Sequence, residues 1–292
     1  MEDMITGLCP QCGHTLHIPA ELASFSCMYC GTRLTKEQLA AEPPAAQEAD
    51  EDRAAYYDRA VSRLGWCIKN FGGYQKKIMR DVFFEAFETY ETGCAPVIQE
   101  LARGVAPEQQ TQLLGRAATA MLDELEAGWQ KKGDMEDEKI VLAIFFVPMV
   151  RKQQLPISEE FVTILQKQWV ERYPKSPFYL GDYESISGGF RKKFLGLCFI
   201  TTAVCQELGK PDDCEELTAF RAFRDGYLRS QPDGEALIRE YYNIAPGIVT
   251  CINTCSDRHA SYARIREEYL APCYQDLLAG RNESCKARYV RM

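Results

Sequence analysis

The sequence predicts a mainly all-α protein with a small β module at its N-terminus. After residue 53, apolar residues recur at three- and four-residue spacing over most of the chain, which is the period of an amphipathic helix. No segment in that region alternates with the period of two that strands show. Two Cys-x-x-Cys pairs, each followed by glycine, lie within the first 31 residues and indicate the β module.

These two cysteine pairs predict a zinc ribbon over residues 1–35. A Cys-x-x-Cys turn directs two thiolates at one ion, and two such turns complete a tetrahedral shell with no open position for catalysis. We therefore expect one structural Zn²⁺, with four free thiols or two disulfides as the alternative. His14 and His17 lie nearby and are expected in loops or at the surface. The predicted ligands are Cys9, Cys12, Cys27 and Cys30.

An acidic linker is expected over residues 36–52. This segment is rich in Ala, Glu, Pro and Asp and has no aromatic residue, so that it cannot bury a core.

A helical bundle is expected over residues 53–175. Five amphipathic helices with short connections are typical of an antiparallel bundle. The apolar run Ile140–Val150 is too short to cross a bilayer and contains Pro148, so we expect a buried helix there. Gly93 is expected to follow the end of the second helix. The expected helices cover residues 56–71, 75–91, 107–131, 137–153 and 158–173.

Residues 174–190 are expected to be a loop, because two prolines and three glycines interrupt the helical pattern. A second helical domain should follow over residues 190–292. Asp233 can cap a helix over 234–243, Pro246 can open the next one, and a long polar helix should begin near Ala260. In residues 194–209 the β-branched Ile200, Thr201 and Thr202 leave a buried strand as the alternative to a helix.

Part of this second domain, residues 198–250, resembles the bacterial CFI-box family. That family begins CFIATA and later carries an FRD-x-x-L segment, a glycine, and paired tyrosines before a proline. The matching stretches here are Cys198-Phe199-Ile200-Thr201-Thr202-Ala203, Phe223-Arg224-Asp225-Gly226-Tyr227-Leu228, Gly234, Tyr241-Tyr242 and Pro246. Val204-Cys205 stands where the family usually has Tyr-Gly. Some members carry the box before a membrane-anchoring tail, which implies a sorting role there. The resemblance implies no catalytic activity, and we expect no membrane association here.

Several side chains of this region are candidates for chemistry. An arginine beside a buried cysteine lowers the thiol pKa and makes the sulfur nucleophilic. Arg221 and Asp225 are four residues apart and can pair on one helix face. A cysteine hydrolase also needs a histidine base, and only His259 is available in this half of the chain. The alternative is a structural cysteine in a tight helix junction. The candidate set is Cys198, Arg221, Arg224, Asp225 and Tyr242.

Four further cysteines stand near the C-terminal end. They could hold a second metal or pair as a redox couple, although their spacing matches no standard zinc knuckle, and reduced buried thiols are the alternative. They are Cys251, Cys255, Cys273 and Cys285.

Charge and cysteine usage narrow the functional classes. The net charge is −8, and the ribbon has only Arg33 and Lys36 as cations, which disfavours nucleic acid as a partner. The acidic N-terminus has no secretory signal, and zinc thiolates need reducing conditions, so we expect a cytoplasmic protein. The resemblance to the CFI-box family implies a bacterial one. The leading hypothesis is a zinc-binding adaptor that binds a protein partner. A thiol-dependent enzyme centred on Cys198 and a nucleic-acid-binding regulator are the other two hypotheses. The oligomeric state is left open.

Overall fold

The mainly all-α fold class is confirmed by the structure. The structure is a computed structural model that describes residues 4–11, 15–28, 30–39, 50–191 and 198–292. It contains two compact units, residues 1–54 and residues 55–292. Most of the expected linker, residues 40–49, lies outside the described residues.

The N-terminal unit consists of two antiparallel hairpins. Strand β1 (Met4–Leu8) pairs with β2 (Thr15–Pro19), and β3 (Ser24–Ser26) pairs with β4 (Arg33–Thr35), before a short 3₁₀ turn, η1 (Lys36–Gln38). Because side chains alternate along a strand, Leu16 and Ile18 point to one face. They form a small core with Leu34 and the sulfurs of Cys9 and Cys27.

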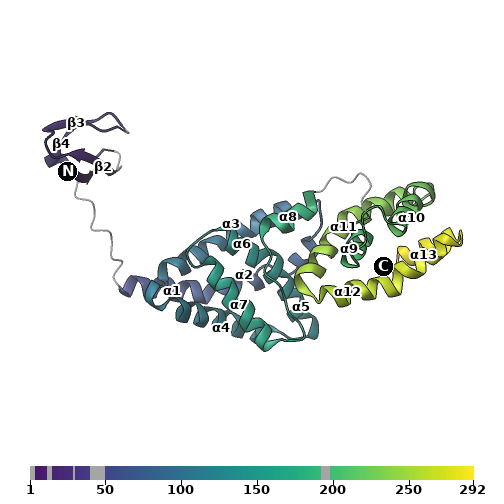
Figure 1. Cartoon of the computed structure of the whole chain (residues 1–292). Coiled ribbons are helices and arrows are strands. Elements are labelled where there is room, and N and C mark those ends of the chain that lie inside the picture. The colour runs from purple at the N-terminus through teal and green to yellow at the C-terminus, as the bar shows by residue number, and fades with distance from the viewer. Residues whose placement is uncertain (1–3, 12–14, 29, 40–49, 192–197) are drawn as a thin grey trace. The chain divides into compact units, whose positions relative to one another are not determined.

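The first part of the helical unit surrounds a buried apolar segment. All residues from Val141 to Val150 are buried, which confirms the expected buried helix. Figure 1 shows α4 alongside α7. The elements are α1 (Asp50–Leu64), α2 (Trp66–Lys69), η2 (Tyr74–Lys77), α3 (Phe83–Gly104), η3 (Pro107–Gln109), α4 (Gln110–Gly128), α5 (Lys132–Val141), the π-helical η4 (Leu142–Phe146), α6 (Val147–Lys152), α7 (Ser158–Arg172) and α8 (Tyr183–Arg191).

Two helix boundaries differ from the sequence expectation. The helix expected to end before Gly93 continues as α3 to Gly104, with Pro96 inside it. A Cβ atom on Gly93 would lie 3.2 Å from the Phe71 ring, so this glycine allows close packing and does not end the helix. The prediction of an uninterrupted loop over residues 174–190 is also wrong, because α8 forms there. Asp182 caps α8 by accepting from the Ser185 amide at 2.7 Å, and Phe190 stacks on Phe83 with centroids 4.3 Å apart.

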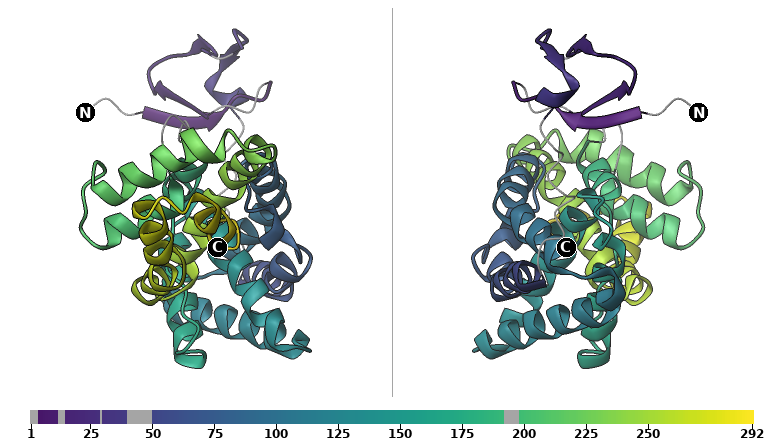
Figure 2. Two further views of the ribbon diagram at one scale, coloured as in Figure 1. Left: turned by 90° about the vertical axis from the view of Figure 1, so that its right-hand side faces the viewer. Right: turned by 90° about the vertical axis from the view of Figure 1, so that its left-hand side faces the viewer.

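The second part of the unit begins at Cys198 and is also helical, which settles the alternative of a buried strand in favour of a helix. Its elements are α9 (Phe199–Glu207), α10 (Glu215–Phe223), the π-helical η5 (Arg224–Leu228), α11 (Gly234–Cys255), α12 (Arg258–Ile265), the π-helical η6 (Arg266–Leu270), α13 (Ala271–Leu278) and α14 (Asn282–Tyr289). Helices α10 and α13 are in contact, as are α9 and α12. Figure 2 shows the green helices of this part next to its yellow C-terminal helices.

In this part too, a proline and a glycine lie inside a helix, whereas the sequence predicted a helix start there. Pro246 does not open a new helix but lies inside α11, where it is buried with Gly247. A Cβ atom on Gly247 would lie 1.9 Å from the carbonyl oxygen of Ile78, so this part of α11 packs directly on the backbone of the first part. The expected long terminal helix is divided instead. Gly280, with φ of +70°, separates α13 from α14.

Two hydrophobic cores share helix α11. Cys255 at its C-terminal end packs in the core formed by residues 57–190, whereas Ile238 near its start packs in the core of residues 198–292. The backbone amide of Arg80 also donates to the carbonyl of Asn243, at 3.0 Å. Among the described residues, none of the helices combines the length and the hydropathy that crossing a membrane would require.

Candidate functional site

The cysteines of the two hairpins form a compact thiol cluster. The sulfur atoms of Cys9, Cys27 and Cys30 all lie within 4.8 Å of one another, and those of Cys9 and Cys30 are 3.7 Å apart. Four Zn–S bonds of about 2.3 Å in a tetrahedron place the sulfurs roughly 3.8 Å apart. The cluster therefore has the dimensions of a metal-binding group and could hold a metal ion.

The backbone shapes the second cysteine turn of this cluster. The Cys27 carbonyl accepts from the amide of Gly31 at 2.8 Å, and the Cys27 amide donates to the carbonyl of Thr32 at 2.8 Å. Gly31 adopts φ of +75°, a conformation that glycine reaches without steric cost. The expected ligand Cys12 and the neighbouring His14 lie outside the described residues, and His17 is exposed, as expected.

The second candidate site joins the two segments that carry the CFI-box resemblance. Cys198 is the N-cap of α9, and Arg224 begins the π-helical segment η5 after α10. The guanidinium Nη1 of Arg224 lies 3.5 Å from the Cys198 sulfur and donates to the Tyr242 hydroxyl at 2.8 Å. Cys198 is thus buried and lies against the segment that carries Arg224.

Asp225 balances the charge of the buried arginine. It accepts from Nε and Nη2 of Arg224, at 2.8 and 2.7 Å. This pairing holds the pKa of the Asp225 carboxyl below its usual value and raises the pKa of Arg224. Burial raises the pKa of the Cys198 thiol, and the nearby guanidinium offsets that effect only in part. The thiol is therefore protonated near neutral pH.

Arg221 does not pair with Asp225 as the sequence predicted. Its guanidinium pairs with Asp212, with Nη2 2.8 Å from Oδ1, so the predicted Arg221–Asp225 ion pair is wrong. The backbone explains the difference. From Arg224 the helix has π geometry, with the Arg229 amide donating to the Arg224 carbonyl, and the wider turn breaks the simple four-residue register. Asp225 instead contacts Arg224 and Arg229.

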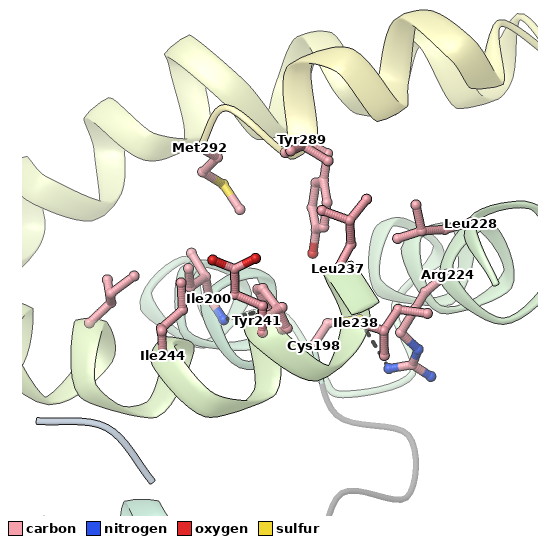
Figure 3. Close-up of a pocket in the computed structure, with 13 residues that line it drawn as sticks. Cys198, Ile200, Arg224, Leu228, Leu237, Ile238, Tyr241, Ile244, Tyr289 and Met292 are labelled. Carbon is pink, nitrogen blue, oxygen red and sulfur yellow. Dashed lines mark hydrogen bonds between the residues drawn. The ribbon is translucent and has the colours of Figure 1, made fainter. Parts of the chain in front are cut away.

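A cavity of about 260 Å³ opens beside Cys198 and Arg224. In Figure 3, Tyr289 and Met292 of the C-terminal segment face Ile200 and Tyr241 across it. The Tyr241 hydroxyl accepts from the Ile200 amide at 3.0 Å, and the Tyr289 hydroxyl lies 3.4 Å from Oγ1 of Thr201.

Sequence reasoning missed Glu240, Tyr241 and Tyr289 as lining residues of this cavity. Residues 237, 241, 244 and 248 of α11 have the spacing of one helix face, and this spacing could have predicted the side of the cavity that α11 forms. No comparable local signal identifies Tyr289, which comes from α14, far away in sequence.

The four C-terminal cysteines do not assemble into one group. Cys251 and Cys255 pack with the first core, whereas Cys273 and Cys285 are buried in the second. Within the described residues, the thiols of Cys9, Cys27 and Cys30 form the one group of potential metal ligands. The alternative of reduced thiols, of which those of Cys255, Cys273 and Cys285 are buried and that of Cys251 is half-buried, fits the four cysteines better than a second metal site. His259 pairs with Glu207 on α9.

Comparisons with protein-family models, with curated proteins and with solved structures found no match to this chain.

Proposed function

We propose that this protein is an adaptor whose N-terminal module folds around one Zn²⁺ and docks a protein partner, while the helical unit binds a second partner or ligand. The observation that carries the proposal is the thiol cluster of Cys9, Cys27 and Cys30, whose spacing suits tetrahedral thiolate coordination. Cys12 would supply the fourth ligand. A four-thiolate shell has no open position, so the metal would stabilise a binding surface.

The surface of the module supports a protein partner. Met28, in the turn between two of the cysteines, is 79% exposed, and Leu22 is also exposed. Exposed apolar side chains on a small module suit insertion into apolar pockets of a partner, and Met adapts well to irregular ones. Nucleic acid remains the weaker proposal, because Arg33 and Lys36 are too few for a phosphate-binding surface.

The site at Cys198 supports binding rather than thiol catalysis. Burial raises the pKa of this thiol, so little nucleophilic thiolate is present near neutral pH. The contact between Cys198 and Arg224 joins the two segments that resemble the CFI-box family. This contact supports the proposal that the chain is related to that family. The many reduced thiols likewise support a cytoplasmic location.

Two measurements test the adaptor proposal. Metal analysis of the purified chain should find about one zinc per molecule, lost in Cys27→Ser. A photo-crosslinking amino acid at Met28 should yield a discrete protein adduct in cells, and the adduct should disappear in the Cys27→Ser background. The same amino acid at Gln38, also exposed on this module, is the matched control. A folded, metal-free N-terminal unit, or an adduct with nucleic acid only, would overturn the proposal.

A further inference from the structure

The cavity beside Cys198 has predominantly apolar walls. Its floor is one face of α11, where residues at three- and four-residue spacing point the same way. Side chains from α9, from η5 and from the C-terminal segment complete the enclosure. The apolar lining residues are Ile200, Leu228, Leu237, Ile238, Ile244, Ile248, Val290 and Met292. An apolar cavity with a few polar groups is the usual form of a small-molecule site.

Most polar groups of the cavity are already engaged within the protein. The charge of Arg224 is matched by the bidentate contact with Asp225. The hydroxyl of Tyr241 accepts from a backbone amide, and that of Tyr289 lies within hydrogen-bonding distance of Thr201. These groups leave little attraction for an anionic ligand.

Glu240 is the exception among the polar lining residues. It lies on α11 between Leu237 and Tyr241, lines the cavity, and is exposed to solvent. Within the part of the chain that the structure describes, no cationic side chain forms an ion pair with it. A carboxylate beside an apolar cavity attracts a cation whose body is apolar, because the body leaves water while the charge stays at the solvent side.

We infer that this cavity binds a small amphipathic amine, with its apolar ring or chain between α11 and the C-terminal segment and its ammonium group at Glu240. This inference rests on the proposed binding role of the helical unit and is independent of the zinc site. A cavity of about 150 Å³ accommodates benzene. The larger volume here suits a bicyclic ring.

Three probes of nearly equal size and different charge test this inference: tryptamine, its neutral alcohol analogue tryptophol, and indole-3-acetate. Calorimetric titration of the full chain at pH 7.5 and low salt should show tryptamine binding about fivefold more tightly than tryptophol, as expected for one exposed charge pair. Indole-3-acetate should bind most weakly. In Glu240→Gln the affinities for tryptamine and tryptophol should become equal, whereas Glu235→Gln, on the same helix but outside the cavity, should retain the difference.

Alkylation of Cys198 reports where the probe binds. Saturating tryptamine at pH 9 should slow the reaction of Cys198 with iodoacetamide at least severalfold and leave that of Cys214, which does not line the cavity, unchanged. The inference is overturned if no probe binds saturably, which would favour an apolar protein segment as the occupant. It is also overturned if indole-3-acetate binds most tightly or if Glu240→Gln keeps the preference. Because Cys27→Ser should bind tryptamine normally, failure here is distinguishable from failure of the adaptor proposal.

Discussion

The guanidinium of Arg224 and the thiol of Cys198 are in direct contact, with Nη1 3.5 Å from Sγ, although the two residues are 26 positions apart in the chain. A cation so close to sulfur favours the thiolate, but burial acts in the opposite direction and dominates. Since Asp225 also neutralises the guanidinium, the pair forms a structural junction between α9 and η5 and one wall of the cavity.

Cys198 is expected to react slowly with iodoacetamide in the native protein at neutral pH, because the thiol is buried and its pKa is raised. Its rate should rise only above about pH 8.5, the ordinary thiol pKa. Mass spectrometry of the modified peptide from pH 6 to pH 10 gives the rate, and urea-unfolded protein gives the reference. Rapid native alkylation at pH 7 that is lost in Arg224→Gln would instead reveal an activated thiolate.

Arg224→Ala should lower the free energy of unfolding by about 2–3 kcal/mol, because it removes several charge-assisted hydrogen bonds of a buried side chain. Arg229→Ala is the matched control. Its side chain is half exposed and its ion pairs lie at the surface, so the loss should stay below about 1 kcal/mol. Urea denaturation followed by helical circular dichroism measures both. Equal losses would show that Arg224 does not stabilise the junction.

Asp225 should make the stability of the helical unit depend on pH in the acidic range. Its folded pKa lies below the unfolded value, so the Arg224–Asp225 pair contributes full stabilisation above the unfolded pKa. That contribution is lost as pH falls through the folded pKa. The difference in unfolding free energy between wild type and Asp225→Asn should therefore be constant from about pH 7 to pH 5 and shrink toward pH 3. A difference that does not change over this range would refute the assignment.

Gly247→Ala should destabilise the helical unit by about 1–3 kcal/mol, because the added methyl group would overlap the Ile78 carbonyl and force two backbones apart. Gly115→Ala is the opposite case. This glycine lies inside α4 with no atom within 4 Å of the added Cβ, so alanine should stabilise the helix by about 0.5–1 kcal/mol. Thermal denaturation of both variants gives the comparison. A neutral Gly247→Ala would mean that α11 does not pack closely on the first part.

Removal of metal by a chelator should abolish amide protection in residues 4–39 and leave the helical unit unchanged, because zinc binding supplies the folding energy of so small a module. Hydrogen exchange with mass spectrometry resolves the two regions. Cys67→Ser, at a buried cysteine of the helical unit, is the control variant and should not affect N-terminal protection. Protection of residues 4–39 that survives complete metal removal would contradict this expectation.

Several features could be predicted from local sequence, because they depend on local geometry. The helical period identified the buried segment around Ile144. The cysteine spacing predicted a cluster of four thiols, of which the structure describes three, those of Cys9, Cys27 and Cys30, and these lie together. The position of Cys198 against the helix that carries Arg224 was also predictable, since one short connection joins the two elements.

The tertiary structure decided the features that depend on contacts between distant segments. Gly93 was expected to end a helix, Pro246 to open one, and the glycines of α8 to keep residues 174–190 in a loop. All of them lie inside helices instead. These helices pack on distant segments, through Gly93 on Phe71, Gly247 on Ile78 and Phe190 on Phe83. The cavity also depends on contacts between distant segments. Tyr289 faces Ile200 and Tyr241 across the cavity because the fold brings α14 to the opposite side from α9 and α11, and no periodic pattern encodes the proximity of segments so far apart. Helix propensities differ by less than about 1 kcal/mol for most residues, by about 1 kcal/mol for glycine and by about 3 kcal/mol for proline. Burying one large apolar side chain is worth about 1.5–3 kcal/mol, so the packing of several such side chains prevails where the two conflict.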